Sequence, residues 1–341
     1  MGKTYKAMQV TRPGQLDMVE KDLPEPGPGE VLIKVEACGI CGADSGAIEG
    51  LEKSIEYPRV PGHEVVGTIC KTSGPLPAWL KPGQRVGVGR LGGHCNVCEQ
   101  CRLGHFNLCQ NQPVTGSSRD GGYAEYMLAR ETGLVAIPDD LSSVDAAPLL
   151  CAGIATFNAL KKSHAQAGDT VVIQGMGGLG HLALQYARKM GFRVVAVGRG
   201  EDIADEVMML GAHHYVDTHK QDAVEAIKAV GGAQIILSTI TESPAVSALL
   251  PALLPHGRMM IVGVGSEPLT LIPGLMVGRE LAVNGAITGT AIELEKTLNF
   301  SLLADIRAKI ETRTLAQAQE AFEKMRSGQA KFRMVLTMDH A

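Results

Sequence analysis

The chain has little aromatic content, no excess of basic charge and no long apolar segment, and these absences exclude several classes of protein. Its formal net charge is −4, which offers no basic face for nucleic acid. No apolar run is long enough to cross a bilayer, and residues 1–6 lack the apolar core of a signal peptide. We therefore expect a cytoplasmic protein that has no nucleic-acid or membrane partner.

The chain is rich in glycine and contains eight cysteines. Aromatic residues make up 4% of it while there are 41 glycines, which indicates many tight turns and close backbone approaches. At 341 residues the chain is too long for one ordinary core, so two domains are expected. The eight cysteines of a protein in a reducing compartment favour metal binding or catalysis over disulfides.

Three separated residues could form a catalytic zinc site. Cys41 and His63 lie in one stretch, and Cys151 lies far downstream. A catalytic zinc takes three protein ligands and leaves a fourth position open, and one histidine with two cysteines is a known set. Each residue taken singly also has a plain interpretation, as a buried cysteine or a satisfied polar histidine. The surrounding motifs decide between these interpretations.

Four further cysteines give the strongest local signal. They fall within residues 95–109, at Cys95, Cys98, Cys101 and Cys109. Two-residue gaps let a turn point successive sulfurs at one ion, so this spacing predicts a closed, structural zinc site. Such a site fastens a lobe and says nothing about the reaction. The other two cysteines, Cys38 and Cys70, are expected to be buried in strands.

The first 150 residues read as short strands separated by proline and glycine. Residues 31–37, 65–70 and 85–89 are rich in β-branched side chains, and turn-forming residues lie between them. This part of the chain is therefore expected to be β-rich, with functional loops.

From about residue 151 the pattern changes to alternating strands and helices. Residues 170–174 read as a buried strand, 181–190 as a helix and 193–197 as the next strand. Between the first two lies a GxGxxG turn, which in this context predicts a dinucleotide site with the pyrophosphate at the helix N-terminus. Further strands are expected at 233–238 and 257–263. The candidate cofactor contacts are Gly175, Gly177, Gly178, Leu179 and Gly180, with Val262 and Gly263 at the end of the last strand.

The end of the second strand bears on the choice between NAD and NADP. An NAD site usually has an acidic residue there for the ribose 2′-hydroxyl, whereas this chain has Gly198 followed by Arg199. The missing acid admits a 2′-phosphate, and Arg199 could pair with it. Alternatively, Arg199 is a solvated loop residue and Glu201 or Asp202 contacts the ribose. NADP is favoured, and NAD stays open.

Taken together, these motifs resemble the zinc-dependent medium-chain alcohol dehydrogenases over essentially the full length of the chain. The motifs that carry the resemblance are Gly39-Ile40-Cys41 with Asp44, Gly62-His63-Glu64, the four-cysteine lobe, residues 121–126, residues 149–153 and the glycine-rich turn.

The resemblance implies an α/β fold with two domains and a defined reaction. A GroES-like catalytic domain would cover residues 1–152, a Rossmann cofactor-binding domain 153–287, and residues 288–341 would return to the catalytic domain. Cys41, His63 and Cys151 would hold the catalytic zinc, with Glu64 as a transient fourth ligand. The enzyme would transfer hydride between a small primary or secondary alcohol, or its aldehyde or ketone, and NAD(P). Family habit suggests a homotetramer or homodimer.

Several further roles follow from the same resemblance. Asp44 is expected to orient His63, or else to cap the short helix after Cys41. Thr156 is expected either to contact the nicotinamide or to pack within a helix. Ile48 is a candidate for the substrate pocket.

Two positions in the expected substrate pocket depart from the family pattern. Ala43 stands where relatives carry a serine or threonine that relays the alcohol proton, so Ser45 or an ordered water would have to substitute. Arg90 stands where many relatives place a tryptophan against the substrate. It either favours a substrate with a carboxylate or another polar tail, or points away to a surface acid.

Two other functions are kept as alternatives. One is a non-catalytic NADPH-binding protein on the same scaffold, with Ala43 as the mark of lost activity. The other is a polyol or amino-alcohol dehydrogenase, although relatives of that type often lack a cysteine as third ligand.

Overall fold

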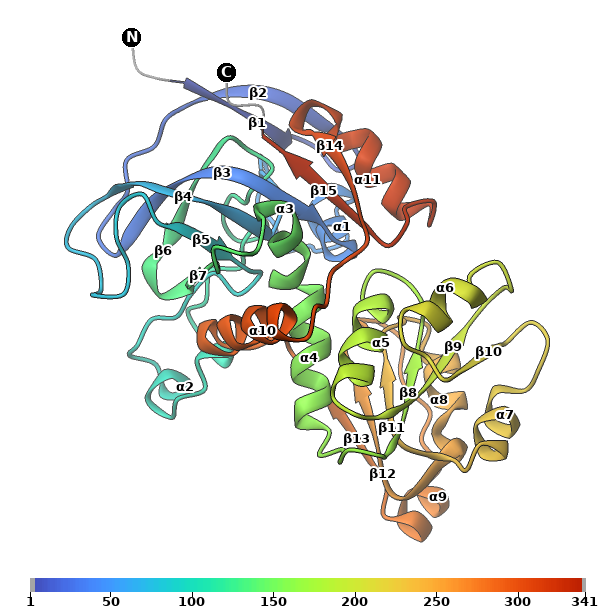
Figure 1. Ribbon diagram of the computed structural model, residues 1–341. Coiled ribbons are helices and arrows are strands. Elements are labelled where there is room, and N and C mark those ends of the chain that lie inside the picture. Colours follow the sequence, from blue (N-terminus) through green and yellow to red (C-terminus); the bar gives the residue numbers. More distant parts are fainter. Residues whose placement is uncertain (1–3, 339–341) are drawn as a thin grey trace. The chain divides into compact units, whose positions relative to one another are not determined.

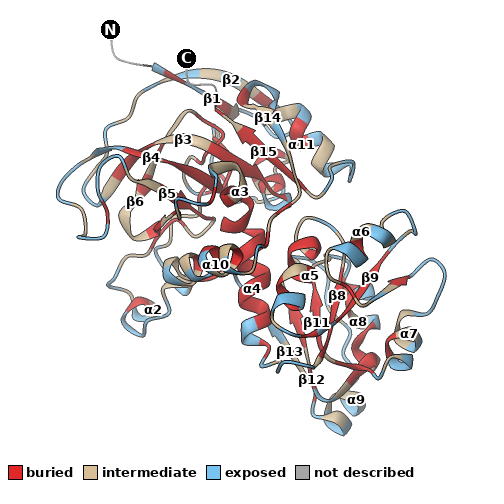
Figure 2. Cartoon of the chain, in the orientation of Figure 1, coloured by how far each residue is buried: buried red, intermediate tan, exposed pale blue. Residues whose placement is uncertain are grey.

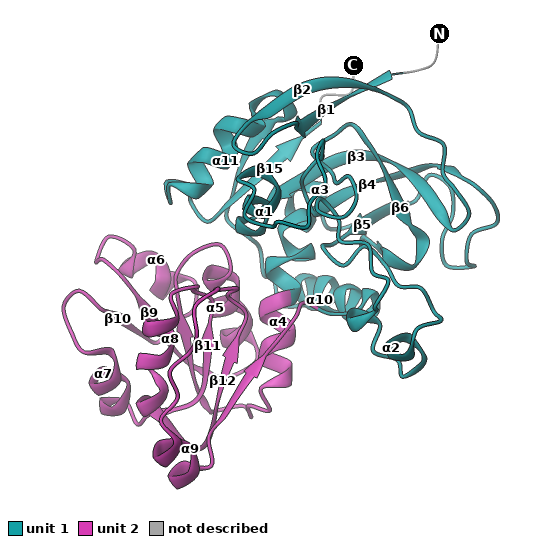
Figure 3. Cartoon of the chain, turned by 180° about the vertical axis from the view of Figure 1, so that it is seen from behind, with its two compact units in different colours: residues 1–154, 289–341 teal, residues 155–288 magenta. Residues whose placement is uncertain are grey.

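The protein is described here by a computed structural model that covers residues 4–338. Its chain divides into two compact units, Met1–Ile154 with Gly289–Ala341, and Ala155–Thr288 (Figure 3). The expectation that residues 1–6 lack the apolar core of a signal peptide concerns, in residues 1–3, a part of the chain outside the described residues. Each unit has its own sheet, and the chain has the expected α/β composition with a β-rich first unit.

The first unit contains a seven-stranded sheet and a two-stranded ribbon (Figure 1). Its strands are β1 (Thr4–Val10), β2 (Leu16–Asp22), β3 (Glu30–Ile40), β4 (Glu64–Thr72), β5 (Arg85–Val88), β6 (Tyr126–Arg130), β7 (Leu134–Ala136), β14 (Ile310–Thr314) and β15 (Arg333–Thr337). The large sheet has the order β14-β15-β3-β4-β5-β7, with β6 paired to β3, and β1 pairs with β2. All pairs are antiparallel except β14 with β15.

The helices of the first unit are short, apart from two near the C-terminus. They are α1 (Ser45–Ile48), α2 (Glu99–Arg102), α3 (Ser143–Ala146), α10 (Ala291–Leu303) and α11 (Ala318–Arg326), with the 3₁₀ turns η1 (Gly42–Asp44), η2 (Phe106–Leu108), η3 (Glu131–Gly133), η4 (Ala147–Leu150) and η6 (Leu315–Gln317). Helix α10 begins with a capping box in which Thr290 and Glu293 satisfy each other's backbone N–H groups. Helix α11 packs on β15, β14 and β3.

Strand β3 is the centre of the first unit. Its sequence is rich in valine, isoleucine and leucine, and seven of the side chains that it places in the sheet are apolar and buried. It pairs with β4 and β6, and also with β15 from the C-terminal end of the chain, where Leu336 lies opposite Cys38. The last strand of the protein therefore lies beside the strand that leads into Cys41.

The second unit is a parallel sheet with helices between its strands. The strands are β8 (Thr170–Gln174), β9 (Arg193–Gly198), β10 (His214–Asp217), β11 (Ala233–Ser238), β12 (Leu253–Ile261) and β13 (Ala282–Gly285). The helices are α5 (Gly180–Lys189), α6 (Ala204–Met209), α7 (Ala223–Ala229), α8 (Ser243–Ala248), η5 (Leu250–Ala252) and α9 (Pro273–Arg279), and α4 (Ala152–Lys162) crosses the boundary between the units.

The order in this sheet is β10-β9-β8-β11-β12-β13, with every pair parallel. The chain starts in the middle at β8, moves outward through β9 to β10, and then returns to β11 on the other side. Ligands of open parallel sheets bind at such a switch point, at the carboxyl ends of the strands.

No single helix among residues 4–338 is long and apolar enough to span a membrane. Residues Ser143–Leu150 and Ala152–Lys162 reach that length and hydropathy only as a pair bent by 49°. Most of their residues are buried inside the protein, as the red colouring of α4 shows (Figure 2). Burial in the protein core accounts for their apolar composition.

Candidate metal and cofactor sites

The register between β3 and β4 brings the first two candidate ligands together. Gly39 in β3 lies opposite Glu64 in β4. Cys41 follows Gly39 by two residues and His63 immediately precedes Glu64, so both enter the same end of the sheet. A Cβ atom on Gly39 would lie 1.9 Å from Oε2 of Glu64, so only glycine leaves room for this carboxylate.

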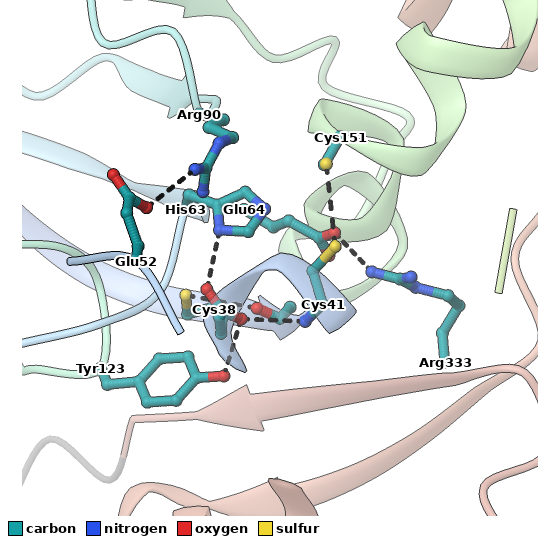
Figure 4. A network of polar contacts seen from close by, with 11 residues as sticks. Cys38, Cys41, Glu52, His63, Glu64, Arg90, Tyr123, Cys151 and Arg333 are labelled. Carbon is teal, nitrogen blue, oxygen red and sulfur yellow. Dashed lines mark hydrogen bonds and ion pairs between the residues drawn. The ribbon is translucent and has the colours of Figure 1, made fainter. Parts of the chain in front are cut away.

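The third candidate ligand, Cys151, follows η4, which packs against β3, β4 and β5. Its sulfur lies 3.9 Å from the sulfur of Cys41. Two thiolates bound at 2.3 Å to one tetrahedral ion are about 3.8 Å apart, so this spacing fits zinc. The donor atoms of Cys41, His63, Glu64 and Cys151 all lie within 4.8 Å of one another, and all four residues are buried (Figure 4).

A buried aspartate orients the imidazole of His63. Nδ1 of His63 lies 2.7 Å from Oδ1 of Asp44, and Nε2 has no hydrogen-bond partner among the described residues. Burial opposes protonation of the ring, but the charge and hydrogen bond of Asp44 outweigh it and raise the pKa of His63 to about 10. Asp44 also accepts hydrogen bonds from the backbone N–H of Cys41 (2.9 Å) and the hydroxyl of Tyr123 (3.0 Å). These contacts are compatible with both roles expected for Asp44, orienting His63 and capping the turn after Cys41.

Glu64 forms an ion pair with Arg333 of β15, and both side chains are almost completely buried (Figure 4). Arg333 donates through Nη2 to Oε1, whereas Oε2 has no partner among the described residues. Burial raises the pKa of Glu64 to about 7, against the lowering effect of the Arg333 charge. One oxygen is therefore held by the guanidinium and the other is left free within the donor cluster.

The four cysteines of the lobe also form a single donor set. Their sulfurs lie within 4.8 Å of one another. Backbone N–H groups point at these sulfurs, including Cys98 N to Cys95 Sγ at 3.4 Å and Cys95 N to Cys109 Sγ at 3.3 Å. A hydrogen bond from the side chain of Asn111, followed by those of two backbone N–H groups, lowers the pKa of Cys95 to about 5. Such bonds favour the thiolate, the form that binds metal.

Cysteine sulfur and imidazole nitrogen are ligand types that zinc prefers. The unpartnered Nε2 of His63 and the spacing of the sulfurs of Cys41 and Cys151 fit a zinc ion with three protein ligands. The four-cysteine set fits a closed zinc site with four protein ligands. The predicted pair of zinc sites, one catalytic and one structural, is confirmed as two separate donor sets.

The glycine-rich turn lies between β8 and α5, as predicted. Gly175 has φ = +96°, a conformation that favours glycine. A Cβ atom on Gly180 would lie 1.8 Å from the carbonyl oxygen of Gly175, so this position too requires glycine. Gly177 has open space around it, and Leu179 is the N-cap of α5. The open side of the turn leaves the backbone of Gly177 free to approach a pyrophosphate.

Other candidate cofactor residues lie at the same edge of the second sheet. Parallel pairing places Gln174 opposite both Val197 and Ser238, and Ser238 opposite Ile261. Gly198 is the last residue of β9, and Val262 and Gly263 directly follow β12. The N–H groups of Val262 and Gly263 donate to the carbonyl of Ser238. The glycine-rich turn and these strand ends therefore form one edge.

Four predicted residues have environments that the sequence left open. Ala43 is exposed, and Thr156 is completely buried in α4. Arg90 forms an ion pair with Glu52. The expectation for Ile48 was wrong, because it is 1% exposed in the hydrophobic core of the first unit and has no surface to offer a substrate.

Cys38 is buried in β3 as expected, but the expectation for Cys70 was wrong. Cys70 lies in β4 and is exposed. Burial along β4 ends before its last three residues, so the strand runs out of the core at this point. Its thiol bonds the carbonyl of Leu32.

Sequence reasoning missed Arg333 and Glu52, the partners of Glu64 and Arg90. Neither lies in a recognisable motif. Arg333 is 269 residues from Glu64, and only the pairing of β15 with β3 brings it to the site.

Comparisons with known proteins agree with this structure. Residues 27–139 match the family model for the alcohol dehydrogenase GroES-like domain, and residues 178–302 match that for the zinc-binding dehydrogenase. The alcohol dehydrogenase notN of Aspergillus sp. (strain MF297-2) is 39% identical over 99% of each chain.

Two solved structures illustrate the likeness in three dimensions. The acetophenone reductase of Geotrichum candidum, in complex with NAD, is 27% identical with a TM-score of 0.87, and the match covers 99% of this chain and 98% of that one. A zinc-binding dehydrogenase of Sinorhizobium meliloti 1021, bound to NADP, is 28% identical with a TM-score of 0.88, and the match covers 98% and 99%.

The chain belongs to the zinc-containing medium-chain alcohol dehydrogenase family, with a GroES-like unit and a Rossmann-like unit. Its activity is that of a zinc-dependent alcohol dehydrogenase, an oxidoreductase that acts on CH–OH donors with a nicotinamide cofactor.

Proposed function

We propose that this enzyme interconverts small primary or secondary alcohols and their carbonyl compounds at a zinc ion held by Cys41, His63 and Cys151, and that it prefers NADP(H). The observation that carries the zinc assignment is the buried set of donor atoms within 4.8 Å, in which Nε2 of His63 has no protein partner among residues 4–338. The free oxygen of Glu64 makes it the transient fourth ligand. Cys95, Cys98, Cys101 and Cys109 hold the structural zinc.

When bound, zinc polarises the substrate oxygen as a Lewis acid and the nicotinamide accepts or donates the hydride. The residues of this chain supply the positions and charges. Asp44 holds the proton of the His63 ring on Nδ1, which directs the lone pair of Nε2 into the donor set. Arg333 fixes one oxygen of Glu64 and so limits how far this side chain moves. Burial of all four donors excludes water from the ligand side of the site.

The preference for NADP(H) rests on the end of β9. A Cβ atom on Gly198 would lie 2.9 Å from Met176 Cγ and from the hydroxyl of Tyr215, so an acidic side chain has no room there. Arg199, next in the chain, is exposed and makes no hydrogen bond or ion pair among the described residues. It is therefore available for a 2′-phosphate.

Two of the acids near this loop are already engaged. Glu201 pairs with Lys220, and Asp217 accepts hydrogen bonds from the backbone N–H groups of Gly200 and His219. The interpretation in which Glu201 contacts the ribose is thus less favoured, whereas Asp202, which has no hydrogen bond or ion pair among the described residues, stays open as a ribose contact. Because Tyr215 also donates to the carbonyl of Gly200, the loop that carries Arg199 is held at both sides.

Changing Arg199 to alanine tests this preference. A hydrogen bond to a charged group is worth about 1.5–3 kcal/mol, so KM for NADPH should rise roughly 10- to 100-fold while KM for NADH stays unchanged. Arg193→Ala is the matched control, because Arg193 is exposed at the other end of the same strand. Equal effects of Arg199→Ala on both cofactors would refute the NADP preference.

Ala43 has no hydroxyl, so the alcohol proton needs another route. Ser45 lies two residues further on, is 4% exposed, and its Oγ has no hydrogen-bond partner among residues 4–338. We assign the relay to Ser45 or to an ordered water in its place. A Ser45→Ala variant with an unchanged pH profile and rate of alcohol oxidation would exclude Ser45.

We also propose that the enzyme forms a homodimer or homotetramer through the edge of the second sheet. Strand β13 is one of the two edge strands of that sheet, the other being β10. Large apolar side chains near β13 are exposed, including Val264 (91%), Val277 (79%) and Ile272 (57%). Light scattering of Val277→Asp, which should shift the protein toward monomer, tests this assignment.

A further inference from the structure

Glu52, Arg90 and Ser117 form a polar cluster in the first unit that takes no part in either donor set. Figure 4 shows two of its members, Glu52 and Arg90. Nη2 of Arg90 lies 3.4 Å from Oε2 of Glu52, and the hydroxyl of Ser117 donates to Oε1 at 2.7 Å. The side chains of Arg90 and Glu52 are 28% and 33% exposed. The cluster is therefore neither a core ion pair nor a freely solvated one.

The segment that contains Arg90 contacts the segment that carries the third proposed zinc ligand, Cys151. A Cβ atom on Gly89 would lie 2.8 Å from the carbonyl oxygen of Leu150, the residue before Cys151. The backbones of these two segments are thus in direct contact, one residue away from Arg90 and from Cys151.

Glu52 and the segment that contains Ser117 contact the segments that carry the other two proposed ligands, Cys41 and His63. A Cβ atom on Gly46 would lie 3.2 Å from Oε2 of Glu52, and Gly46 is in the short helix that follows Cys41. A Cβ atom on Gly116 would lie 2.8 Å from the backbone nitrogen of Gly62, the residue before His63. Arg90 and Ser117 each follow a glycine that lies against a ligand segment, and Glu52 itself lies against a third, so the three members of the cluster are connected to the segments of three different ligands.

The guanidinium of Arg90 keeps most of its hydrogen-bonding capacity. It carries five N–H donors, and Glu52 is its only partner among residues 4–338. At 3.4 Å that contact is longer than the 2.7–2.9 Å of a strong charged pair. Glu52, in contrast, accepts from both Ser117 and Ser54 on its other oxygen. The carboxylate is held in place, and the arginine has donors to spare.

We propose that the Glu52–Arg90 pair is a specificity determinant that selects alcohols and carbonyl compounds carrying a second, uncharged oxygen, such as a hydroxyl or a further carbonyl group. This inference rests on the proposed function, because it assigns the substrate class of that same zinc site. The free N–H groups of Arg90 donate to the second oxygen. A purely hydrocarbon substrate leaves these donors unpaired as it displaces water, which disfavours it.

The fixed carboxylate of Glu52 is the reason that the second oxygen is uncharged. The pair is electrically neutral, so Arg90 offers no net positive charge to a substrate carboxylate. A carboxylate placed on Arg90 would also lie near Glu52, and like charges repel strongly where solvent is partly excluded. Glu52 thus rejects the anionic substrates that an unpaired arginine would attract.

Three benzaldehydes of similar size test this selection, substituted at position 3 with ethyl, hydroxymethyl or carboxyl groups. Reduction by the zinc-loaded enzyme is followed by NADPH consumption. We expect kcat/KM for the hydroxymethyl compound to exceed that for the ethyl compound by about tenfold or more, with the carboxyl compound poorest. Arg90→Met keeps the apolar stem and should bring the hydroxymethyl-to-ethyl ratio close to one.

Glu52→Gln gives a second, opposite result. It removes the negative charge and keeps the hydrogen bond to Ser117, so activity on the carboxyl compound relative to the hydroxymethyl one should rise about tenfold or more. Arg313→Met is the control, because Arg313 pairs with Glu320 on β14 and α11 and should leave all three ratios unchanged.

Two failures are distinguishable. If the zinc-loaded enzyme reduces none of a wider panel of aldehydes and ketones, the proposed function fails, and this inference fails with it. If it reduces all three benzaldehydes but Arg90→Met and Glu52→Gln leave the ratios unchanged, the proposed function stands and the selection by Glu52 and Arg90 is overturned.

Discussion

Replacing Asp44 by asparagine removes one charge from the site and changes almost nothing in size. Asp44 is 3% exposed and accepts three hydrogen bonds, from Nδ1 of His63, the N–H of Cys41 and the hydroxyl of Tyr123. Asparagine offers one acceptor oxygen in place of two. Whichever way its amide turns, its NH₂ group then faces a donor.

The magnitude follows from these contacts. Removing the partner of a metal-bound histidine typically costs 10- to 100-fold in metal affinity, which corresponds to about 1.4–2.7 kcal/mol. An unsatisfied buried N–H adds about 1–3 kcal/mol to the loss of folding stability. We therefore expect Asp44→Asn to fold, to hold the structural zinc normally and to bind the catalytic zinc 10- to 100-fold more weakly.

The assay is competition for zinc with a chelator of known affinity, with the four-cysteine site as an internal reference. Asp139→Asn is the control, because Asp139 is exposed and belongs to neither donor set. An Asp44→Asn enzyme that keeps wild-type affinity for both ions would refute the conclusion that Asp44 supports the catalytic site through His63.

Three other substitutions test separate parts of the structure. Arg333→Met leaves Glu64 buried and unpaired, so urea denaturation should show a loss of about 3–5 kcal/mol, and adding Glu64→Gln should recover part of it. Gly177→Ala should leave the unfolding free energy unchanged within about 0.5 kcal/mol, because the added methyl group would have no atom of the protein within 4 Å. It should still raise KM for the cofactor, because we propose that the pyrophosphate binds against this backbone. Ala43→Ser places a hydroxyl at an exposed position and should raise the rate of alcohol oxidation by up to about 10²-fold, because the hydroxyl gives the alcohol proton an additional route. Unchanged stability, cofactor KM or oxidation rate, respectively, would contradict these expectations.

The parts of the structure that the sequence predicts are those coded locally. The β8 strand, the glycine-rich turn and α5 follow one another within twenty residues, and hydrophobic periodicity together with the steric demands of glycine determines them. The four-cysteine lobe is equally local, because all four of its sulfurs come from the short segment 95–109.

The catalytic donor set depends on contacts between distant residues, and the motifs predicted only its members. Its geometry comes from the antiparallel register of β3 and β4 and from the packing of η4. Arg333 reaches Glu64 only because β15 pairs with β3, and no periodicity in the sequence encodes that pairing.

The sequence also could not predict whether particular side chains are buried or which residues they contact. Ile48 was expected beside a substrate but packs in the core, because the one-turn helix α1 directs it inward. Glu52 was not considered, although it determines how Arg90 acts. Its position depends on the loop after α1, where its backbone N–H bonds the carbonyl of Gly46.

The most direct test of the central claim is the zinc content and turnover of a Cys151→Ala variant. If Cys151 holds the catalytic ion, this variant should retain about one zinc per chain, bind NADPH as the wild type does, and reduce no aldehyde. Retention of two zinc ions with wild-type turnover would contradict the assignment. A wild-type enzyme that binds two zinc ions and NADPH but turns over no substrate would contradict the proposed reaction itself.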